Sequence, residues 1–267
     1  MTFKAVALDL DGTLLVGDDL PEENVAAVQA ARDAGISVMI ASARWVHLAL
    51  RLQETLGITD PIIACSGAQV HDPKLGRDLF DHRLSQDFAD RLYAICNEER
   101  CIATITTDDR VTIKLEGQLD PSVASPEMFG TTELVSMADD LPRIAAVQGS
   151  RCVARIREEL EPEFGGQVNF LDSIGPSGRL VLTLTAREGT KGAALAAACA
   201  HLGIDTREVV AFGDSENDLA MFEAAGAAVA MGQADDATKA AATFVSARND
   251  EGGVAVGIRR LLERGEV

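Results

Sequence analysis

The strongest constraint on the fold is a short apolar strand that ends in two carboxylates. Residues 3–8 are mostly apolar over the length of a strand, and Asp9 and Asp11 follow at its carboxyl end. A strand without polar alternation is typical of a parallel sheet covered on both faces by helices. Side chains two residues apart on an extended chain point the same way, so we expect Asp9 and Asp11 to project together. Such a pair repels itself unless a cation or a shared proton intervenes.

Apolar strands and helices alternate through residues 1–82 and again through residues 187–267. This alternation predicts a doubly wound, mainly parallel, Rossmann-like α/β core. The strands are expected near 3–8, 36–41, 61–65, 208–212, 227–231 and 243–246, and the helices near 22–34, 45–56, 192–203, 215–225, 235–242 and 254–263.

The rhythm changes between residues 83 and 186, where several strands alternate polar and apolar residues, as Val111, Ile113 and Leu115 do. Alternation of this kind is typical of a sheet with one solvated face. We therefore expect an α+β domain inserted into the discontinuous core. Its strands are expected near 102–106, 111–115, 144–148, 167–171 and 180–185, and its helices near 85–99 and 153–160.

Composition narrows the possible partners and compartment. The 24 basic and 42 acidic residues give a net charge of −18, which argues against nucleic acid or an anionic membrane as partner. No apolar run approaches the roughly 18 residues needed to span a bilayer, and no signal peptide is evident. The odd number of scattered cysteines favours reduced thiols over a disulfide framework or a zinc site. We therefore expect a cytoplasmic protein with reduced thiols. The five cysteines are Cys65, Cys96, Cys101, Cys152 and Cys199.

Four short motifs share one property: each follows a core strand or opens a helix. They are Asp9–Thr13, Ser42 with Arg44, Lys191 before Gly192, and Gly213–Asp218. A doubly wound sheet gathers such points at one edge. Carboxylate oxygens suit Mg²⁺, while a lysine, a hydroxyl and helix N-termini suit a phosphate. Together the motifs indicate a phosphoryl-transfer site.

Each motif has an ordinary alternative when taken alone. The Asp9–Gly12 stretch could open a calcium loop, but Thr13 and Leu20 stand where that loop needs its third ligand and its glutamate. The Ser215–Asp218 stretch could be only a helix capping box, and Lys191 only a solvated lysine. Their joint occurrence, in order and at the expected places of a βα repeat, favours the site.

These motifs carry a resemblance to the haloacid dehalogenase superfamily of aspartate-nucleophile phosphatases, and within it to the Cof-type branch of sugar-phosphate phosphatases. The DxDGT and GDxxND patterns match residues 9–13 and 213–218, and the lysine of the third motif falls on Lys191. Residues 42–44 read Ser-Ala-Arg where the branch usually has Thr-Gly-Arg. Residues 66–68 read Ser-Gly-Ala where it often has Asn-Gly-Ala.

The resemblance implies a role for each carboxylate. Asp9 would be the nucleophile and form an aspartyl-phosphate, and Asp11 would protonate the leaving alcohol and then deprotonate the attacking water. Mg²⁺ would be held by Asp9, the backbone carbonyl of Asp11 and Asp214, with Asp218 in support.

The resemblance also implies the phosphate contacts. Ser42 and Lys191 would bind the phosphoryl oxygens, and Lys191 would also neutralise charge beside the nucleophile. Asn217 is a further candidate contact to phosphate or substrate. Arg44 would be either a substrate contact or a structural salt-bridge former. The remaining phosphate-binding candidates are Leu10 and Ala43.

The function implied is a Mg²⁺-dependent phosphatase acting on a small phosphorylated metabolite, with a sugar phosphate as the expected substrate. A phosphomutase similar to phosphomannomutases, or a sensor without catalysis, remains an alternative. The inserted domain, residues 83–186, would be a cap over the catalytic core of residues 1–82 and 187–267, with specificity in stretches 121–132 and 172–178. The expected partner is a small phosphate ester rather than nucleic acid or a membrane, for a monomer or small homo-oligomer.

Overall fold

The computed structural model forms two compact units, residues 1–80 with 190–267, and residues 81–189. It describes residues 3–99, 101–108, 110–115, 127–174 and 180–267. Residues 121–126 and 175–178, which belong to the two stretches expected to set specificity, lie outside this description. No helix of the described ranges is both long and apolar enough to cross a membrane.

The first unit is built on an eight-stranded sheet of order β14-β13-β12-β1-β2-β3-β4-β5. The pairs from β14 to β3 are parallel, and β4 runs antiparallel to β3, so the prediction of a mainly parallel α/β core is confirmed. The strands are β1 (Ala5–Leu8), β2 (Ser37–Ala41), β3 (Ile62–Ala64), β4 (Gln69–Asp72), β5 (Arg77–Asp81), β12 (Val209–Gly213), β13 (Ala227–Ala230) and β14 (Phe244–Val245).

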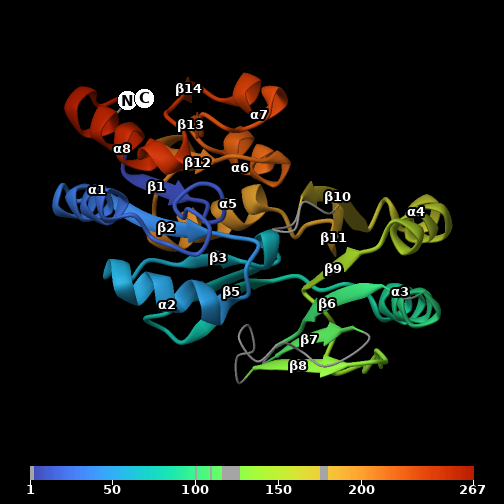
Figure 1. Ribbon diagram of the computed structural model, residues 1–267. Coiled ribbons are helices and arrows are strands. Elements are labelled where there is room, and N and C mark those ends of the chain that lie inside the picture. The colour runs from blue at the N-terminus through green and yellow to red at the C-terminus, as the bar shows by residue number, and fades with distance from the viewer. Residues whose placement is uncertain (1–2, 100, 109, 116–126, 175–179) are drawn as a thin grey trace. The chain divides into compact units, whose positions relative to one another are not determined.

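Helices cover both faces of this sheet (Figure 1). Ala5 and Ala7 of β1 pack in one apolar cluster with residues of α5 and α6. On the opposite face, α8 approaches so closely that a Cβ at Gly257 would lie 2.5 Å from the Phe212 ring. Alternate strand residues point to opposite faces, which is why apolar strands suit this arrangement. The helices are α1 (Glu22–Asp33), α2 (Val46–Leu56), α5 (Lys191–Leu202), α6 (Leu219–Ala224), α7 (Asp236–Ala241) and α8 (Gly253–Arg264).

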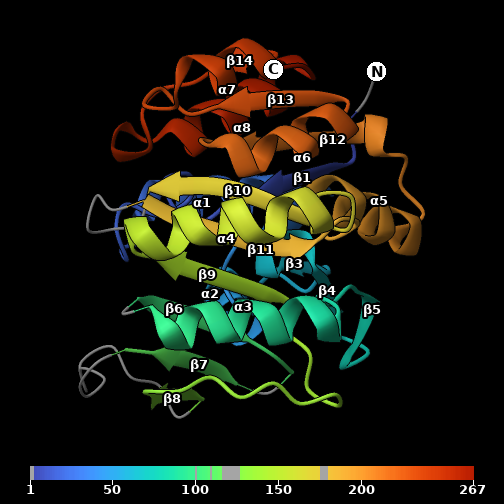
Figure 2. The same cartoon turned by 90° about the vertical axis from the view of Figure 1, so that its right-hand side faces the viewer.

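The second unit is an α+β domain with a six-stranded sheet of order β10-β11-β9-β6-β7-β8. Figure 2 shows α3 (Gln86–Glu98) and α4 (Ser150–Phe164) side by side across one face of that sheet. Between helices and sheet lies an apolar core in which the Phe88 and Phe164 rings meet edge to face at 5.2 Å. The strands are β6 (Ile102–Thr106), β7 (Val111–Lys114), β8 (Met128–Thr131), β9 (Ile144–Gln148), β10 (Val168–Ile174) and β11 (Leu180–Ala186).

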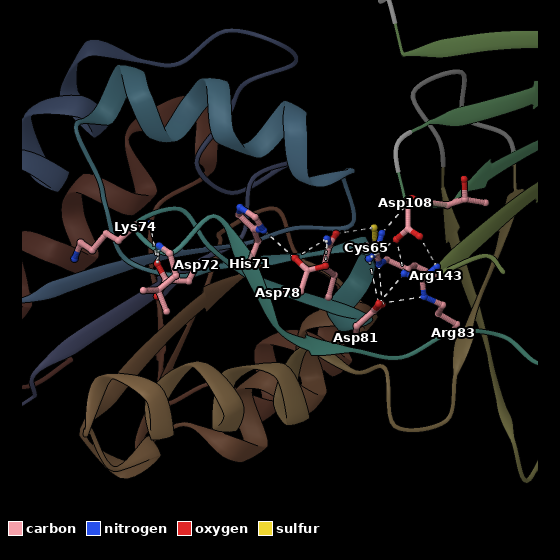
Figure 3. Close-up of polar contacts among 12 residues, drawn as sticks. Cys65, His71, Asp72, Lys74, Asp78, Asp81, Arg83, Asp108 and Arg143 are labelled. Atoms are coloured by element: carbon pink, nitrogen blue, oxygen red, sulfur yellow. Dashed lines mark hydrogen bonds and ion pairs between the residues drawn. The ribbon is translucent and has the colours of Figure 1, made fainter. Parts of the chain in front are cut away.

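Three strands were not predicted: β4, β5 and β8. The residues of β4 and β5 include Gln69, His71, Asp72, Arg77 and Asp78, which are polar and poor strand formers, so the hydrophobic periodicity of these two strands is weak. In the structure these polar groups satisfy one another: the Gln69 amide donates to Asp78 at 3.0 Å, and His71 Nδ1 lies 2.8 Å from the same carboxylate (Figure 3). Helix α4 is also longer than predicted, 150–164 rather than 153–160.

A balanced ion-pair network lies within the second unit, where its chain begins (Figure 3). Arg143 is buried, and its guanidinium contacts Asp81 at 2.7 Å and Asp108 at 2.8 Å. Arg83 contacts the same two carboxylates, Asp81 at 2.7 Å and Asp108 more closely still. Because two arginines face two aspartates, each charge has a partner.

Candidate active site

Three adjacent strand ends bring the predicted motifs to one edge of the core sheet. Leu8, the last residue of β1, is in register with Ile40 of β2 and Phe212 of β12. Asp9 follows Leu8 directly, and Ser42 and Asp214 follow the last residues of the neighbouring strands. Parallel strands end at a common edge, so all three residues leave the sheet on the same side.

The centre of this edge is a buried lysine held between two aspartates. Lys191 is the first residue of α5, and its ammonium lies 2.6 Å from both Asp9 Oδ1 and Asp218 Oδ1. The side chains of Lys191 and Asp218 are completely buried, and that of Asp9 is 6 % exposed. Buried charges of this kind are stable only when paired, so the three residues fix one another's positions.

Negative charge is nevertheless in excess here. Burial raises the pKa of Asp9, and the carboxylates of Asp218 and Asp214 add to this against the opposing effect of Lys191. Burial and the charge of Asp218 also raise the pKa of Asp214, to about 6. Burial would lower the pKa of Lys191, but the two carboxylates outweigh it and the pKa is raised. The ammonium alone does not neutralise three carboxylates.

The loop after β12 is organised by Asp218. Its Oδ2 accepts hydrogen bonds from the backbone amides of Asp214 (3.0 Å) and Ser215 (3.2 Å), so the predicted capping box is present in addition to the lysine contact. A Cβ at Gly213 would lie 2.4 Å from the Asp218 side chain, which explains the glycine. Asn217 Oδ1 accepts from Lys191 at 3.3 Å.

Gly12 allows the loop after β1 to lie against Asp214. Its φ is +81°, and a Cβ there would come 2.3 Å from Asp214 Oδ2, so a side chain is excluded on both counts. The amide of Gln233 donates to the Gly12 carbonyl at 2.5 Å and also hydrogen-bonds Asp214. Gln233 was not a sequence candidate, because it lies outside all four motifs.

Gln233 is itself positioned by a hydrogen bond from Asn249, in the C-terminal part of the unit. Its Oε1 accepts from the Asn249 backbone amide at 3.0 Å, and the Asn249 side chain donates to the Leu15 carbonyl at 2.9 Å. Two amide side chains distant in sequence therefore fix the loop between residues 12 and 15. No sequence pattern indicated this function for them.

Asp11 does not point at the Lys191 cluster but forms an ion pair with Arg44. The Arg44 guanidinium contacts Asp11 Oδ1 at 2.6 Å and Asp18 at 3.2 Å, and hydrogen bonding to Asp11 raises the pKa of Arg44. Of the two predicted roles for Arg44, the structure shows the salt bridge. The Asp11 side chain is 52 % exposed, in contrast to buried Asp9, so the two carboxylates are not equivalent.

The remaining phosphate-binding candidates lie at the same edge. The side chain of Ser42 is buried, and its hydroxyl oxygen accepts from the Arg44 amide at 3.0 Å, which leaves its hydrogen for another acceptor. Leu10 is completely buried, so only its backbone is available to a ligand, and Ala43 is partly exposed between Ser42 and Arg44.

A strained turn at Cys65 and Ser66 contacts both Ser42 and the start of α5. Cys65 and Ser66 both have positive φ, 52° and 56°, which non-glycine residues adopt rarely. The amide of Ser66 donates to the Ser42 carbonyl at 3.1 Å, and a Cβ at Gly67 would lie 2.3 Å from the Lys191 amide nitrogen. The turn therefore fixes Ser42 and the start of α5 relative to each other, and strain of this kind is typical of functional sites.

The donor set fits a divalent cation. Asp9, Asp214 and Asp218 each offer a carboxylate oxygen, and these oxygens lie within 4.8 Å of one another. Oxygen donors suit a hard cation. The excess of negative charge, visible in the raised pKa values of Asp9 and Asp214, is what a bound cation would remove.

Comparison with known proteins agrees with the fold. The family model described as haloacid dehalogenase-like hydrolase matches residues 6–258. The chain belongs to this family, as the resemblance implied, and the predicted enzyme class of phosphoric monoester hydrolase is confirmed by relatives that are phosphatases.

Curated relatives match over nearly their whole length. The chain is 31 % identical to the 5-amino-6-(5-phospho-D-ribitylamino)uracil phosphatase YwtE of Bacillus subtilis, covering 97 % of this chain and 98 % of the relative. It is 28 % identical to the pyridoxal phosphate phosphatase YbhA of Escherichia coli, covering 96 % and 97 %.

Solved structures show the same architecture. A haloacid dehalogenase-like hydrolase from B. subtilis superposes with a TM-score of 0.82 at 26 % identity, over 97 % of this chain and 99 % of that chain. The subclass IIB sugar phosphatase BT4131 superposes with a TM-score of 0.80 at 22 % identity, over 99 % and 100 %. The predicted core and inserted α+β domain are therefore those of this family.

Proposed function

We propose that the protein is a Mg²⁺-dependent phosphatase that hydrolyses a small sugar-phosphate-like metabolite through an aspartyl-phosphate on Asp9. The observation that carries the proposal is the buried Asp9–Lys191–Asp218 cluster with Asp214 beside it at the carboxyl edge of the sheet. A structural ion pair has no need of a third carboxylate, whereas a phosphoryl-transfer site needs a cation and a nucleophile together.

Asp9 is the nucleophile. Its Oδ1 is bound by Lys191, which orients the carboxylate and leaves Oδ2 to attack phosphorus. Lys191 neutralises charge that builds up on the phosphoryl oxygens, and the free hydrogen of the Ser42 hydroxyl is donated to the same oxygens, with the backbone of Leu10 and Ala43 and the Asn217 amide as further contacts.

A cation would be held by Asp9, Asp214 and the Asp11 carbonyl, with Asp218 behind them. When bound, Mg²⁺ supplies positive charge that offsets the repulsion between the nucleophile and the phosphate. Asp218 uses both oxygens for Lys191 and the backbone amides of the 214–215 turn, so it supports the site by holding the loop.

Asp11 is the acid and base. It is the exposed member of the pair, and the Arg44 ion pair holds its side chain away from the buried cluster. The leaving-group oxygen receives a proton from Asp11, and the water that hydrolyses the aspartyl-phosphate then returns one to it. Arg44 must release Asp11 for this step, which makes Arg44 a positioning residue for the acid.

The substrate class follows from the family. Relatives are named for a ribitylaminouracil phosphate and for pyridoxal phosphate, and a structural neighbour is a sugar phosphatase. These compounds share a small polar body carrying a phosphate monoester. We propose the same class for this chain, with residues 81–189 acting as the cap that selects the leaving group and excludes water.

The first test replaces the nucleophile. Asp9→Asn should abolish release of phosphate from p-nitrophenyl phosphate in Mg²⁺, a loss of at least ~10³-fold, because the amide cannot attack phosphorus. Lys74→Met, a change at an exposed lysine of the same unit, is the matched control and should keep full activity. Full activity of Asp9→Asn would exclude Asp9 as the nucleophile.

The second test separates the two carboxylates. Asp11→Asn should slow turnover by roughly 10²- to 10⁴-fold, the usual contribution of general acid–base catalysis. Acid quenching with a reactive substrate such as p-nitrophenyl phosphate should trap a chain heavier by one phosphoryl group, because loss of the base slows hydrolysis of the intermediate. If both variants lost the same activity and no phosphorylated Asp11→Asn chain were trapped, the separate roles proposed for Asp9 and Asp11 would be wrong.

A panel of hexose and pentose phosphates distinguishes hydrolysis from the alternative transfer. Phosphate release in the absence of any bisphosphate supports the phosphatase. Isomerisation of a hexose phosphate without phosphate release would indicate a mutase instead, and binding without any turnover would indicate a sensor.

A further inference from the structure

Three of the five cysteines meet inside the second unit, far apart in sequence. Cys96 lies in the last turn of α3, Cys101 directly precedes β6, and Cys152 lies in the first turn of α4. Each offers its sulfur, and the three sulfurs lie within 4.8 Å of one another. All three residues are buried, with at most 4 % of their surface exposed. We propose that this cysteine cluster binds a thiophilic divalent cation, Zn²⁺ in particular.

The local backbone is built to let these thiols approach. Gly149 precedes α4 with a φ of +127°, and a Cβ there would lie 3.3 Å from the Cys101 Cβ. A side chain at this position would therefore crowd Cys101 while straining the backbone. The glycine lets the start of α4, and with it Cys152, come close to the start of β6.

A buried lysine supplies a counter-charge beside the cluster. Lys114 in β7 is 3 % exposed, and its ammonium lies 3.4 Å from the carbonyl oxygens of Glu99 and Cys101. Among residues that the structure describes, no carboxylate pairs with it. A buried ammonium without a carboxylate is costly unless other negative charge lies nearby. Thiolates next to Cys101 would supply that charge.

Charge balance favours a divalent ion in this cluster. Zn²⁺ bound by three thiolates carries a net charge of −1, and the Lys114 ammonium brings the sum to zero. Soft sulfur donors select Zn²⁺ over the hard cations that suit the carboxylate edge of the first unit. On binding, the thiols lose their protons to solvent and no oxidant or reductant is needed.

A surface depression lies beside Cys152. A depression of about 420 Å³ is lined by Glu98, Glu99, Gly149, Ser150, Arg151 and Cys152. The Glu99 carboxylate is engaged by Arg151 at 3.1 Å and Arg155 at 3.5 Å, so it is not offered as a ligand.

The test uses the full-length chain, stripped of metals and kept reduced, with Mg²⁺ in excess to fill the carboxylate site. Co²⁺ is the probe, because thiolate ligands give it a charge-transfer absorption in the near ultraviolet that oxygen ligands do not. We expect the absorption to saturate at one equivalent of Co²⁺ per chain and to vanish when Zn²⁺ is added. It should be lost in Cys101→Ser and Cys152→Ser.

Cys199→Ser is the matched control, since Cys199 is an equally buried thiol in the other unit, and it should keep the absorption. Absorption that persists in Cys101→Ser, or its absence from wild type with all five thiols titratable, would overturn the proposal. So would titration of only three thiols in unfolded, unreduced protein, which would indicate a disulfide within the cluster.

A second measurement on wild type does not depend on the folding of variants. Zn²⁺ should slow alkylation of Cys96, Cys101 and Cys152 at least tenfold, mapped by peptide mass, and leave Cys199 unchanged. Equal alkylation rates with and without Zn²⁺ would overturn the proposal.

Discussion

The two units each contain a cluster of buried or half-buried charges, and the two clusters are built differently. In the second unit, Arg83 and Arg143 face Asp81 and Asp108 in equal number, and hydrogen bonding from Arg83 lowers the pKa of Asp108. In the first unit, among the residues that the structure describes, three carboxylates share the Lys191 ammonium, and the pKa values of Asp9 and Asp214 are raised.

The difference separates a structural network from a reactive one. Where charges balance, each charge has an ion-pair partner, and the network has a structural role because removing one partner leaves a buried charge unpaired. Where negative charge exceeds positive charge, the folded protein is destabilised until a cation binds, and perturbed pKa values of this kind are typical of functional sites. Balance of charge, rather than burial, distinguishes the two clusters.

The largest effect should come from removing the Lys191 ammonium from the reactive cluster. Lys191→Met leaves Asp9 and Asp218 buried without a partner, which should cost about 3–5 kcal/mol of stability and abolish phosphatase activity. Urea denaturation with and without Mg²⁺ measures the first effect and phosphate release the second. Mg²⁺ should restore part of the stability, and a variant as stable as wild type in metal-free buffer would contradict this account.

A mutation in the ion-pair network of the second unit should change stability by the same amount with and without metal. Arg143→Met removes one of the two arginines that contact Asp81 and Asp108, and we expect a loss of about 3 kcal/mol in the stability of the second unit. The same urea series in Mg²⁺ should give the same loss. Arg151→Met, at an arginine of the same unit whose side chain is 87 % exposed, is the control and should change little. If Mg²⁺ restored the stability lost in Arg143→Met, the ion-pair network of the second unit would depend on a cation as the first-unit cluster does, and the proposed difference between them would be wrong.

The smallest effect should be a gain in the stability of the metal-free protein, in the variant Asp214→Asn. The folded pKa of Asp214, about 6, lies above its ordinary value of 3.8, so metal-free wild type loses stability as the pH rises from about 4 through about 6. Asp214→Asn carries no such charge. Its stability relative to wild type should therefore grow over that interval. The full shift corresponds to about 3 kcal/mol, and solvent screening at this partly exposed side chain reduces the expected advantage to about 1–2 kcal/mol at pH 7.

Thermal melting of both proteins across this pH range measures the advantage of Asp214→Asn. Mg²⁺ should reverse it, because only wild type binds the ion well. An advantage that does not change with pH would show that Asp214 bears no unbalanced charge.

Much of the fold was predictable because each core strand is apolar and ends at a polar motif. The register of β1 with β2 and β12 then follows from general rules for parallel sheets, and with it the common edge of Asp9, Ser42 and Asp214. The β4–β5 hairpin was missed because Gln69, His71 and Asp78 become favourable only once they bond to one another across paired strands.

Side-chain partners were less predictable than the motifs. The sequence contains Arg44 and Asp11 but does not show that they bind each other, and nothing near Gln233 indicates its contacts with Gly12 and Asp214. The cysteine cluster was missed for the same reason: Cys96, Cys101 and Cys152 come from separate elements, and spacing along the chain does not report proximity in space.

The order of the core strands has a consequence for synthesis on the ribosome. β1 lies between β2 and β12, yet β12 begins at residue 209, after the whole second unit has emerged. Until then β1 has an open edge and Asp9 lacks Lys191, whereas residues 81–189 are contiguous and can fold first. The nascent first unit therefore presents the unpaired edge of an apolar strand for most of translation, and an edge of this kind is prone to aggregation.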